Sequence, residues 1–155
     1  MAIEIIEEEH LAFDHPYLAM CYSSLGEVEC ALGNLTEAKQ YLEKSIEIFE
    51  TSFELFERDT ESFEGFDYYK NLFDRNRHKL VQRHSDLYSN LGIFERDIGN
   101  FAEAKRLIEC AIEIDEKHFD SEHPTMATNY SNLGNAERGL GNLEEAKRLL
   151  MIFRK

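Results

Sequence analysis

Histidine and cysteine are the side chains best suited to nucleophilic or metal chemistry, and their spacing in this sequence supports neither. None of the six histidines lies in an H-E-x-x-H motif, and the cysteines form no C-x-x-C pair or Cys-His set. His78 and His84 are six residues apart, so on one helix they would point to different faces and could not share a metal. A G-x-S-x-G nucleophile motif is also absent. The sequence therefore predicts a protein that is not an enzyme and has no cofactor or metal site.

Carboxylates dominate the charged residues. Asp and Glu number 31 against 17 Lys and Arg, which gives a formal net charge of −14. Acid pairs at helical spacing are too common for any one to be singled out as a general acid and base, so we expect a solvated outer face. The negative charge disfavours nucleic acid and anionic membrane surfaces as partners. A protein or peptide partner that is neutral or basic is the better expectation.

The cysteines and the N-terminus predict the cellular compartment. Cys21, Cys30 and Cys110 are odd in number and lack paired spacing, which favours reduced thiols packed in the core or in a groove. Residues 1–9 are acidic and carry too short an apolar run for a secretory signal, and no stretch approaches membrane-spanning length. We therefore expect a cytoplasmic protein.

The elements that carry these residues are repeated along the chain. Three stretches share the pattern apolar, Gly, Asn, apolar, any residue, Glu, Ala, Lys: 32–39, 98–105 and 140–147. Each is preceded by a stretch that reads Tyr, Ser, Ser or Asn, Leu, Gly: 22–26, 88–92 and 130–134. Gly92 and Gly134 are 42 residues apart, whereas Gly26 and Gly92 are 66 apart. The repeat is therefore 42 residues long, with an insertion of 24 between the first two full copies.

Each repeat is predicted to be a helix, a tight turn and a second helix. Apolar residues recur at spacings of three and four, as in Tyr22, Leu25 and Val28, which is the period of a helix. The Gly-Asn pair of each repeat marks the turn. We expect its Gly to adopt the left-handed conformation of a helix end and its Asn to cap the next helix.

These residues resemble the signature of the tetratricopeptide repeat, which has Leu-Gly on the first helix and small residues around a large apolar one on the second. The matching positions are Tyr22, Leu25, Gly26, Ala38, Leu42 and Ser45; Tyr88, Leu91, Gly92, Ala104, Ile108 and Ala111; and Tyr130, Leu133, Gly134, Ala146 and Leu150. The 42-residue period, the His-Pro pairs at 15–16 and 123–124, and the run 111–117 are similar to the kinesin light chain type of repeat. The resemblance implies an all-α, right-handed superhelical solenoid of about seven helices.

On this resemblance the whole chain, 1–155, is a single repeat array. Its parts are the second helix of a truncated repeat at 1–14, repeat 1 at 16–50, a helical insertion at 51–80, repeat 2 at 81–118 and a truncated repeat 3 at 123–155. Both ends resemble cuts through a longer array. We therefore expect either a fragment of a larger protein or self-association through the truncated ends, because a repeat buries its apolar face only against its neighbours.

The insertion is the part that the repeat pattern does not explain. Apolar residues continue at heptad spacing from Leu42 to Phe63, and Val81-Gln82 replaces the His-Pro that would start the next helix. We expect a projecting helical hairpin with its tip near Glu64-Gly65; the alternatives are a degenerate extra helix pair and a mobile acidic loop. Five of its aromatic residues are candidates for partner contact: Phe56, Phe63, Phe66, Tyr68 and Tyr69.

The resemblance also implies where a peptide would bind. Arrays of this family bind peptide segments of partner proteins in a concave groove lined by the first helix of every pair. The corresponding residues are Met20, Ser23, Ser24, Glu27, Asp86, Ser89, Asn90, Ile93, Arg96, Asp97, Thr128, Ser131, Asn132, Asn135 and Arg138. Asn90 and Asn132 suit pairing with a peptide backbone, or they hydrogen-bond between helices instead. Arg96 and Arg138 suit an acidic side chain or a C-terminal carboxylate.

A carboxylate takes the place of the family's usual Tyr in each repeat, at Glu29, Glu95 and Glu137. Each precedes a Lys by ten residues, so one interpretation is an ion pair across each helix pair. The other is a solvated helix end, where an exposed ion pair would contribute about 0 to 1 kcal/mol. The burial of these carboxylates distinguishes the two.

The function predicted from the sequence is a non-catalytic scaffold or adaptor that binds a peptide segment of a partner in the groove. The alternative is a structural or autoinhibitory spacer within a larger sensor or NTPase-linked protein. The two differ in whether the array contacts a foreign peptide or its own chain.

Overall fold

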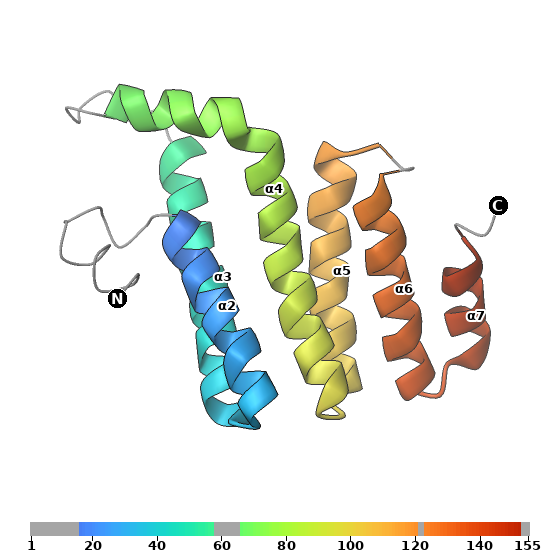
Figure 1. Cartoon of the computed structure of the whole chain (residues 1–155). Helices are drawn as coiled ribbons and strands as arrows, with labels where there is room; N and C mark the ends of the chain where they lie inside the picture. The colour runs from blue at the N-terminus through green and yellow to red at the C-terminus, as the bar shows by residue number, and fades with distance from the viewer. Residues whose placement is uncertain (1–15, 58–65, 121–122, 153–155) are drawn as a thin grey trace. The chain divides into compact units, whose positions relative to one another are not determined.

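The computed structural model describes residues 16–57, 66–120 and 123–152, and for 55–57 and 66–74 the backbone alone. Within these ranges the secondary structure is entirely helical (Figure 1). The helices are α2 (Pro16–Leu32), α3 (Leu35–Glu57), α4 (Phe66–Asp97), α5 (Phe101–His118), α6 (Pro124–Gly139) and α7 (Leu143–Met151). The chain divides into two compact units, Met1–Leu80 and Val81–Lys155. Each unit is described separately below.

In the first unit, α2 and α3 pack against each other as an antiparallel pair (Figure 1). Leu18 and Ala19 of α2 and Leu42 and Phe49 of α3 are buried. At Gly26 the two helices come so close that a Cβ atom would lie 2.7 Å from Cγ of Leu42. The absence of a side chain at Gly26 is therefore what allows this crossing.

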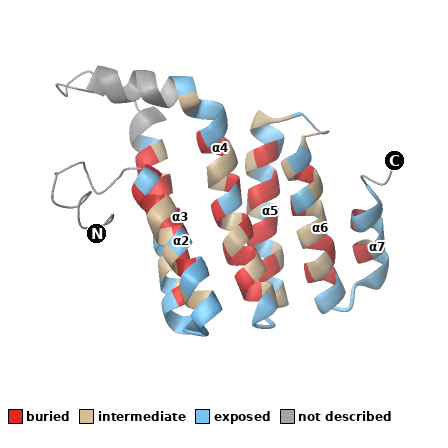
Figure 2. Ribbon diagram, in the orientation of Figure 1, coloured by how far each residue is buried: buried red, intermediate tan, exposed pale blue. Residues whose placement is uncertain are grey.

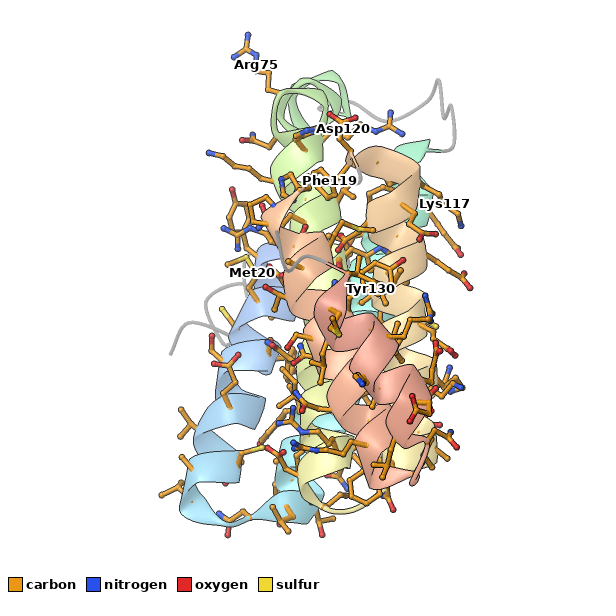
Figure 3. All side chains as sticks on the ribbon, turned by 90° about the vertical axis from the view of Figure 1, so that its right-hand side faces the viewer. Met20, Arg75, Lys117, Phe119, Asp120 and Tyr130 are labelled. Atoms are coloured by element: carbon orange, nitrogen blue, oxygen red, sulfur yellow. The ribbon has the colours of Figure 1, made fainter. Side chains whose placement is uncertain are left out.

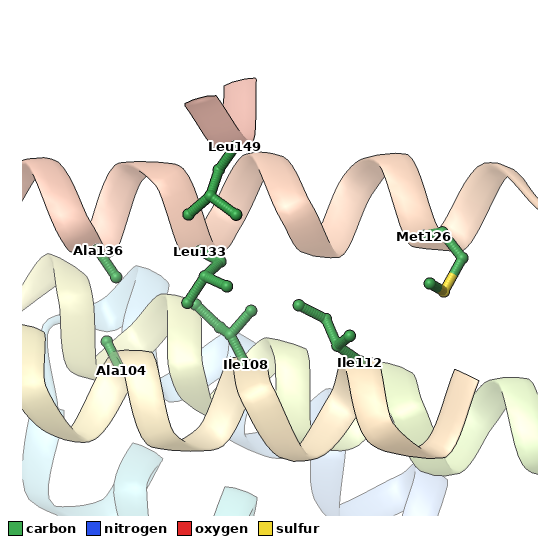
Figure 4. Packing of buried hydrophobic residues seen from close by; sticks show 7 residues of the cluster. All are labelled: Ala104, Ile108, Ile112, Met126, Leu133, Ala136 and Leu149. Carbon is green, nitrogen blue, oxygen red and sulfur yellow. The ribbon is translucent and has the colours of Figure 1, made fainter. Parts of the chain in front are cut away.

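In the second unit, the C-terminal part of α4 is followed by α5, α6 and α7, which lie side by side in chain order (Figure 1). The hydrophobic core of α5 and α6 is arranged in pairs: Ala104 lies opposite Ala136, and Ile108 lies opposite Leu133 (Figure 4). Leu149 of α7 joins the same cluster from the other side of α6. Burial of these residues, shown in Figure 2, supplies the apolar area that holds the three helices together.

The turn of each repeat contains a glycine with positive φ, as predicted: Gly33 at 84°, Gly99 at 88° and Gly141 at 85°. The predicted role of the asparagine is wrong in detail. Asn100 and Asn142 precede α5 and α7, yet neither side chain caps its helix. Each asparagine Nδ2 instead donates back to the carboxylate five residues earlier, at 2.6 to 2.7 Å, in the pairs Asn34–Glu29, Asn100–Glu95 and Asn142–Glu137.

The helices on both sides of the predicted hairpin tip are longer than their counterparts. Helix α3 has 23 residues against 18 in α5, and α4 has 32 against 16 in α6. Pro16 and Pro124 are the first residues of α2 and α6, and α4 runs without a break through Val81-Gln82, where the proline is missing. The tip at Glu64-Gly65, the segment 1–14 and the side chains of all five candidate hairpin aromatics lie outside the described residues.

The glycine crossing in the second unit yields a stability prediction. A Cβ atom on Gly92 would lie 2.7 Å from Cγ1 of Ile108, so Gly92→Ala should destabilise the protein by about 1 to 3 kcal/mol through overpacking. Urea unfolding followed by circular dichroism measures this. The matched control is the same change in an Ile108→Ala background, where the clash is relieved and the cost should shrink. A stabilisation of about 1 kcal/mol, the usual gain from replacing Gly by Ala in a helix, would contradict the close crossing.

Candidate functional site

Five buried or half-buried polar side chains connect α4, α5 and α6. Asn129 of α6 lies at the centre, where its Nδ2 donates to Oδ2 of Asp115 at 2.8 Å and to Oγ of Ser85 at 3.1 Å. Its Oδ1 accepts from Oγ of Ser89 at 2.7 Å. The Ser89 Oγ in turn accepts from Nδ2 of Asn132 at 3.2 Å. Ser85 in turn donates to the carbonyl oxygen of Ala111 at 3.2 Å. The first helices of two successive repeats are therefore hydrogen-bonded to each other directly.

Asp115 is the acid of this network and is fully buried. Burial raises the pKa of its carboxyl group, while the neighbouring Ser85 hydroxyl, the hydrogen bond from Asn129 and the nearby His123 oppose the shift. Among the described residues, its second oxygen, Oδ1, is buried without a hydrogen-bond partner. The network was not predicted from the sequence. Its one visible signal was that Asn129 stands four residues before Leu133, on the face expected to be apolar.

A second polar contact joins α5 to α6 at the other end of the pair. Nζ of Lys105 lies 2.7 Å from Oε1 of Glu137, whose side chain is 4% exposed. Hydrogen bonds from Lys105 and from Asn142 hold the pKa of the Glu137 carboxyl below its usual range, and the same pair raises the pKa of Lys105. The predicted partner of Glu137, Lys147 of its own repeat, is exposed. The ion pair therefore links successive repeats, whereas the sequence had suggested a pair within each repeat.

The predicted groove residues differ widely in exposure. Ser23 and Ser89 are buried. The exposed members are Ser24, Glu27, Asp86, Asp97, Thr128 and Arg138. The half-buried members are Met20, Asn90, Ile93, Arg96, Ser131, Asn132 and Asn135. Asn132 hydrogen-bonds between helices, which is the second of the two roles foreseen for it.

Three charged residues of the predicted groove lie on α4: Asp86, Arg96 and Asp97. The guanidinium of Arg96 donates to Oδ1 of Asp97 through Nε at 3.0 Å and through Nη2 at 2.7 Å, so the two charges offset each other. Partial desolvation raises the pKa of Asp86, and repulsion from Asp115 adds to this, while Arg83 acts in the opposite direction.

A shallow cavity of about 590 Å³ is lined by α5, α6 and α7. Ile112, Leu133 and Leu149 form its apolar part, and Lys105, Glu109, Glu113, Tyr130, Glu137, Asn142, Glu145 and Arg148 line the rest. None of the predicted groove residues lines it. Two pairs of its charged groups lie in contact, Arg148–Glu145 at 2.6 Å and Lys105–Glu137 at 2.7 Å. The hydroxyl of Tyr130 donates to Glu116, outside the cavity, at 3.0 Å. Within the described residues, no group of His, Cys, Asp and Glu has the geometry of a metal site.

Comparison with known proteins agrees with this architecture. Two tetratricopeptide repeat profiles match the sequence, one over residues 18–58 and the other over residues 84–151. This chain belongs to the tetratricopeptide repeat family. Tetratricopeptide repeats are in general protein–protein interaction scaffolds, and the described part of this one has no helix long and apolar enough to cross a membrane. No curated protein is significantly similar to the chain.

Two crystal structures resemble this tetratricopeptide array in fold. Both contain the nearly identical TPR-like repeats of a candidate kinesin light chain from Podosopora anserina, one of them as a methionine-substituted variant. The variant has 22% sequence identity and a TM-score of 0.60 over 98% of this chain and 60% of its own. The other has 22% identity and a TM-score of 0.56 over 96% of this chain and 62% of its own. The chain therefore spans about three fifths of the repeat arrays it resembles.

The burial of Asp115 predicts how stability depends on pH. Because the pKa of its carboxyl is higher in the folded than in the unfolded chain, its contribution to stability is present at acidic pH and is lost as the pH rises through the folded-state pKa. Asp115→Asn keeps an acceptor for Asn129 and removes the buried charge, so its stability relative to the wild type should increase toward neutral pH. Urea unfolding at several pH values measures this. Asp115→Ala, which removes the acceptor, should instead cost about 1 to 3 kcal/mol. Equal losses for both variants at neutral pH would contradict the assignment.

The ion pair between repeats yields a second prediction. Lys105→Met removes the cation beside the buried Glu137 carboxylate and leaves it the hydrogen bond from Asn142, so it should cost about 1 to 3 kcal/mol in the free energy of unfolding. Lys147→Met is the matched control, because Lys147 has the same position in the next repeat and is exposed. Its effect should stay within about 0.5 kcal/mol. A similar loss for the two variants in thermal and urea unfolding would show that the Lys105–Glu137 contact is not stabilising.

Proposed function

We propose that this tetratricopeptide repeat protein binds a peptide segment of a partner along the face formed by α4 and α6. The observation that carries the proposal is the direct hydrogen bonding of these two first helices through Ser89, Asn129 and Asn132. Because the network fixes the spacing of the two helices, the polar side chains beside it form a preorganised surface, which lowers the ordering cost of binding. Asp86, Asn90 and Ile93 from α4 and Ser131, Asn135 and Arg138 from α6 would make the contacts.

The charge of this face supports a neutral or basic partner. Asp97 offsets the charge of Arg96, and the pKa of the Asp86 carboxyl is raised first by partial burial and then by repulsion from Asp115. A lysine or arginine of the partner placed beside Asp86 would relieve that repulsion. The net charge of −14 also opposes binding to nucleic acid or to an anionic membrane surface. Such an adaptor would act in the cytoplasm and without catalysis.

Selection of peptides on the immobilised chain tests the proposal. We expect enrichment of peptides that carry a basic residue, and for an enriched peptide Asp86→Lys should weaken the dissociation constant by about tenfold or more in a fluorescence anisotropy titration. The matched control is Glu113→Lys, which makes the same charge change on the exposed side of α5. Peptides that bind the wild type and both variants equally would place the site elsewhere. If no peptide is enriched, the spacer interpretation gains support.

A further inference from the structure

The interface between α5 and α6 shows what the second helix of a repeat needs from the next repeat. Phe101 lies against Gly139, where a Cβ atom would collide with its ring. Ala104 meets Ala136, and Lys105 pairs with Glu137 at 2.7 Å. Ile108 is completely buried against Leu133. Apolar, small, cationic and branched side chains thus meet complementary groups in a fixed register.

Helix α7 repeats the α5 side of that interface. Its other side packs on α6, and no described helix covers the repeated face. Leu143, Lys147 and Leu150 stand at the positions of Phe101, Lys105 and Ile108. Leu143 is 63% exposed and Leu150 is 44% exposed, in contrast to the buried Ile108. Figure 3 views the molecule from the side on which α7 lies.

Helix α2 repeats the α6 side of the same interface. Val28, Glu29 and Ala31 stand at the positions of Ala136, Glu137 and Gly139. Val28 is 54% exposed, whereas Ala136 is completely buried. Glu29 accepts a hydrogen bond from Asn34 at 2.7 Å, as Glu137 does from Asn142, but no described lysine forms an ion pair with it.

We propose that the α7 face of one copy of this chain docks on the α2 face of a second copy, in the register of α5 on α6. Lys147 would then pair with Glu29 of the second copy. The sizes of the facing side chains also match. Leu143 is smaller than its counterpart Phe101, and Ala31, which would face it, is larger than its counterpart Gly139. This surface is separate from the proposed peptide face on α4 and α6.

The contact is heterologous, because it joins two different faces. One copy of a pair therefore retains its α2 face and the other retains its α7 face, so each can bind a further copy, and two-fold symmetry does not limit the assembly to a dimer. The net charge of −14 opposes association, which makes the contact dependent on local complementarity rather than on general attraction.

Sedimentation velocity over a wide range of protein concentrations tests the proposal. The weight-average mass of the wild type should rise with concentration. Lys147→Glu and Glu29→Lys should each weaken association by about tenfold or more, because like charges then face each other. Lys44→Glu is the matched control, because it makes the same charge change at an exposed residue of α3 that is paired with Glu47. This variant should associate like the wild type.

A mixture of the two charge variants gives the decisive result. Each variant alone should associate about tenfold or more weakly than the wild type. In the mixture the lysine of one copy again faces the glutamate of the other, so association should return toward that of the wild type. Circular dichroism and urea unfolding confirm that both variants fold. A wild type that stays monomeric at all concentrations would overturn the proposal. So would variants that associate as strongly as the wild type, or a mixture that stays monomeric. Peptide binding by Asp86→Lys is measured independently and does not affect these outcomes.

Discussion

Close approach of two helices at a glycine is the constraint on which this structure depends. In each repeat the glycine of the first helix lies against a branched side chain of the second: Gly26 against Leu42, Gly92 against Ile108 and Gly134 against Leu150. A crossing without a side chain on one partner leaves the helices little freedom to slide apart or rotate. Each pair can therefore present a well-defined surface to the next, as Ala104 does to Ala136 (Figure 4).

Hydrophobic packing alone would leave the register of neighbouring repeats weakly specified, because it has no preferred direction. The hydrogen bonds around Asn129 supply that direction. Burying Asp115, Ser85 and Ser89 requires a partner for each polar group, so a shift of α6 along α4 would leave several of them unsatisfied. The polar network thus contributes to the specificity of the arrangement, while the apolar core contributes most of the burial.

The sequence was most informative where structure is decided locally. The positive φ of Gly33, Gly99 and Gly141 and the start of α6 at Pro124 follow from neighbouring residues, and all were predicted. Contacts between repeats were not. Spacing within one repeat suggested Lys147 as the partner of Glu137, whereas Lys105 of the preceding repeat is closer in space. The Asp115–Asn129 contact was missed for the same reason, since its residues belong to different repeats.

The pairing of Lys105 with Glu137 has an evolutionary consequence. Lys105 lies on the second helix of one repeat and Glu137 on the first helix of the next. Each repeat of the sequence carries both a glutamate at this place on its first helix and a lysine at this place on its second helix. A gene segment that encodes one repeat therefore supplies the glutamate for the contact with the preceding repeat and the lysine for the contact with the following repeat. Duplication or deletion of such a segment leaves a matching pair at every remaining junction. For this ion pair, the length of the array can thus change by whole repeats without compensating substitutions.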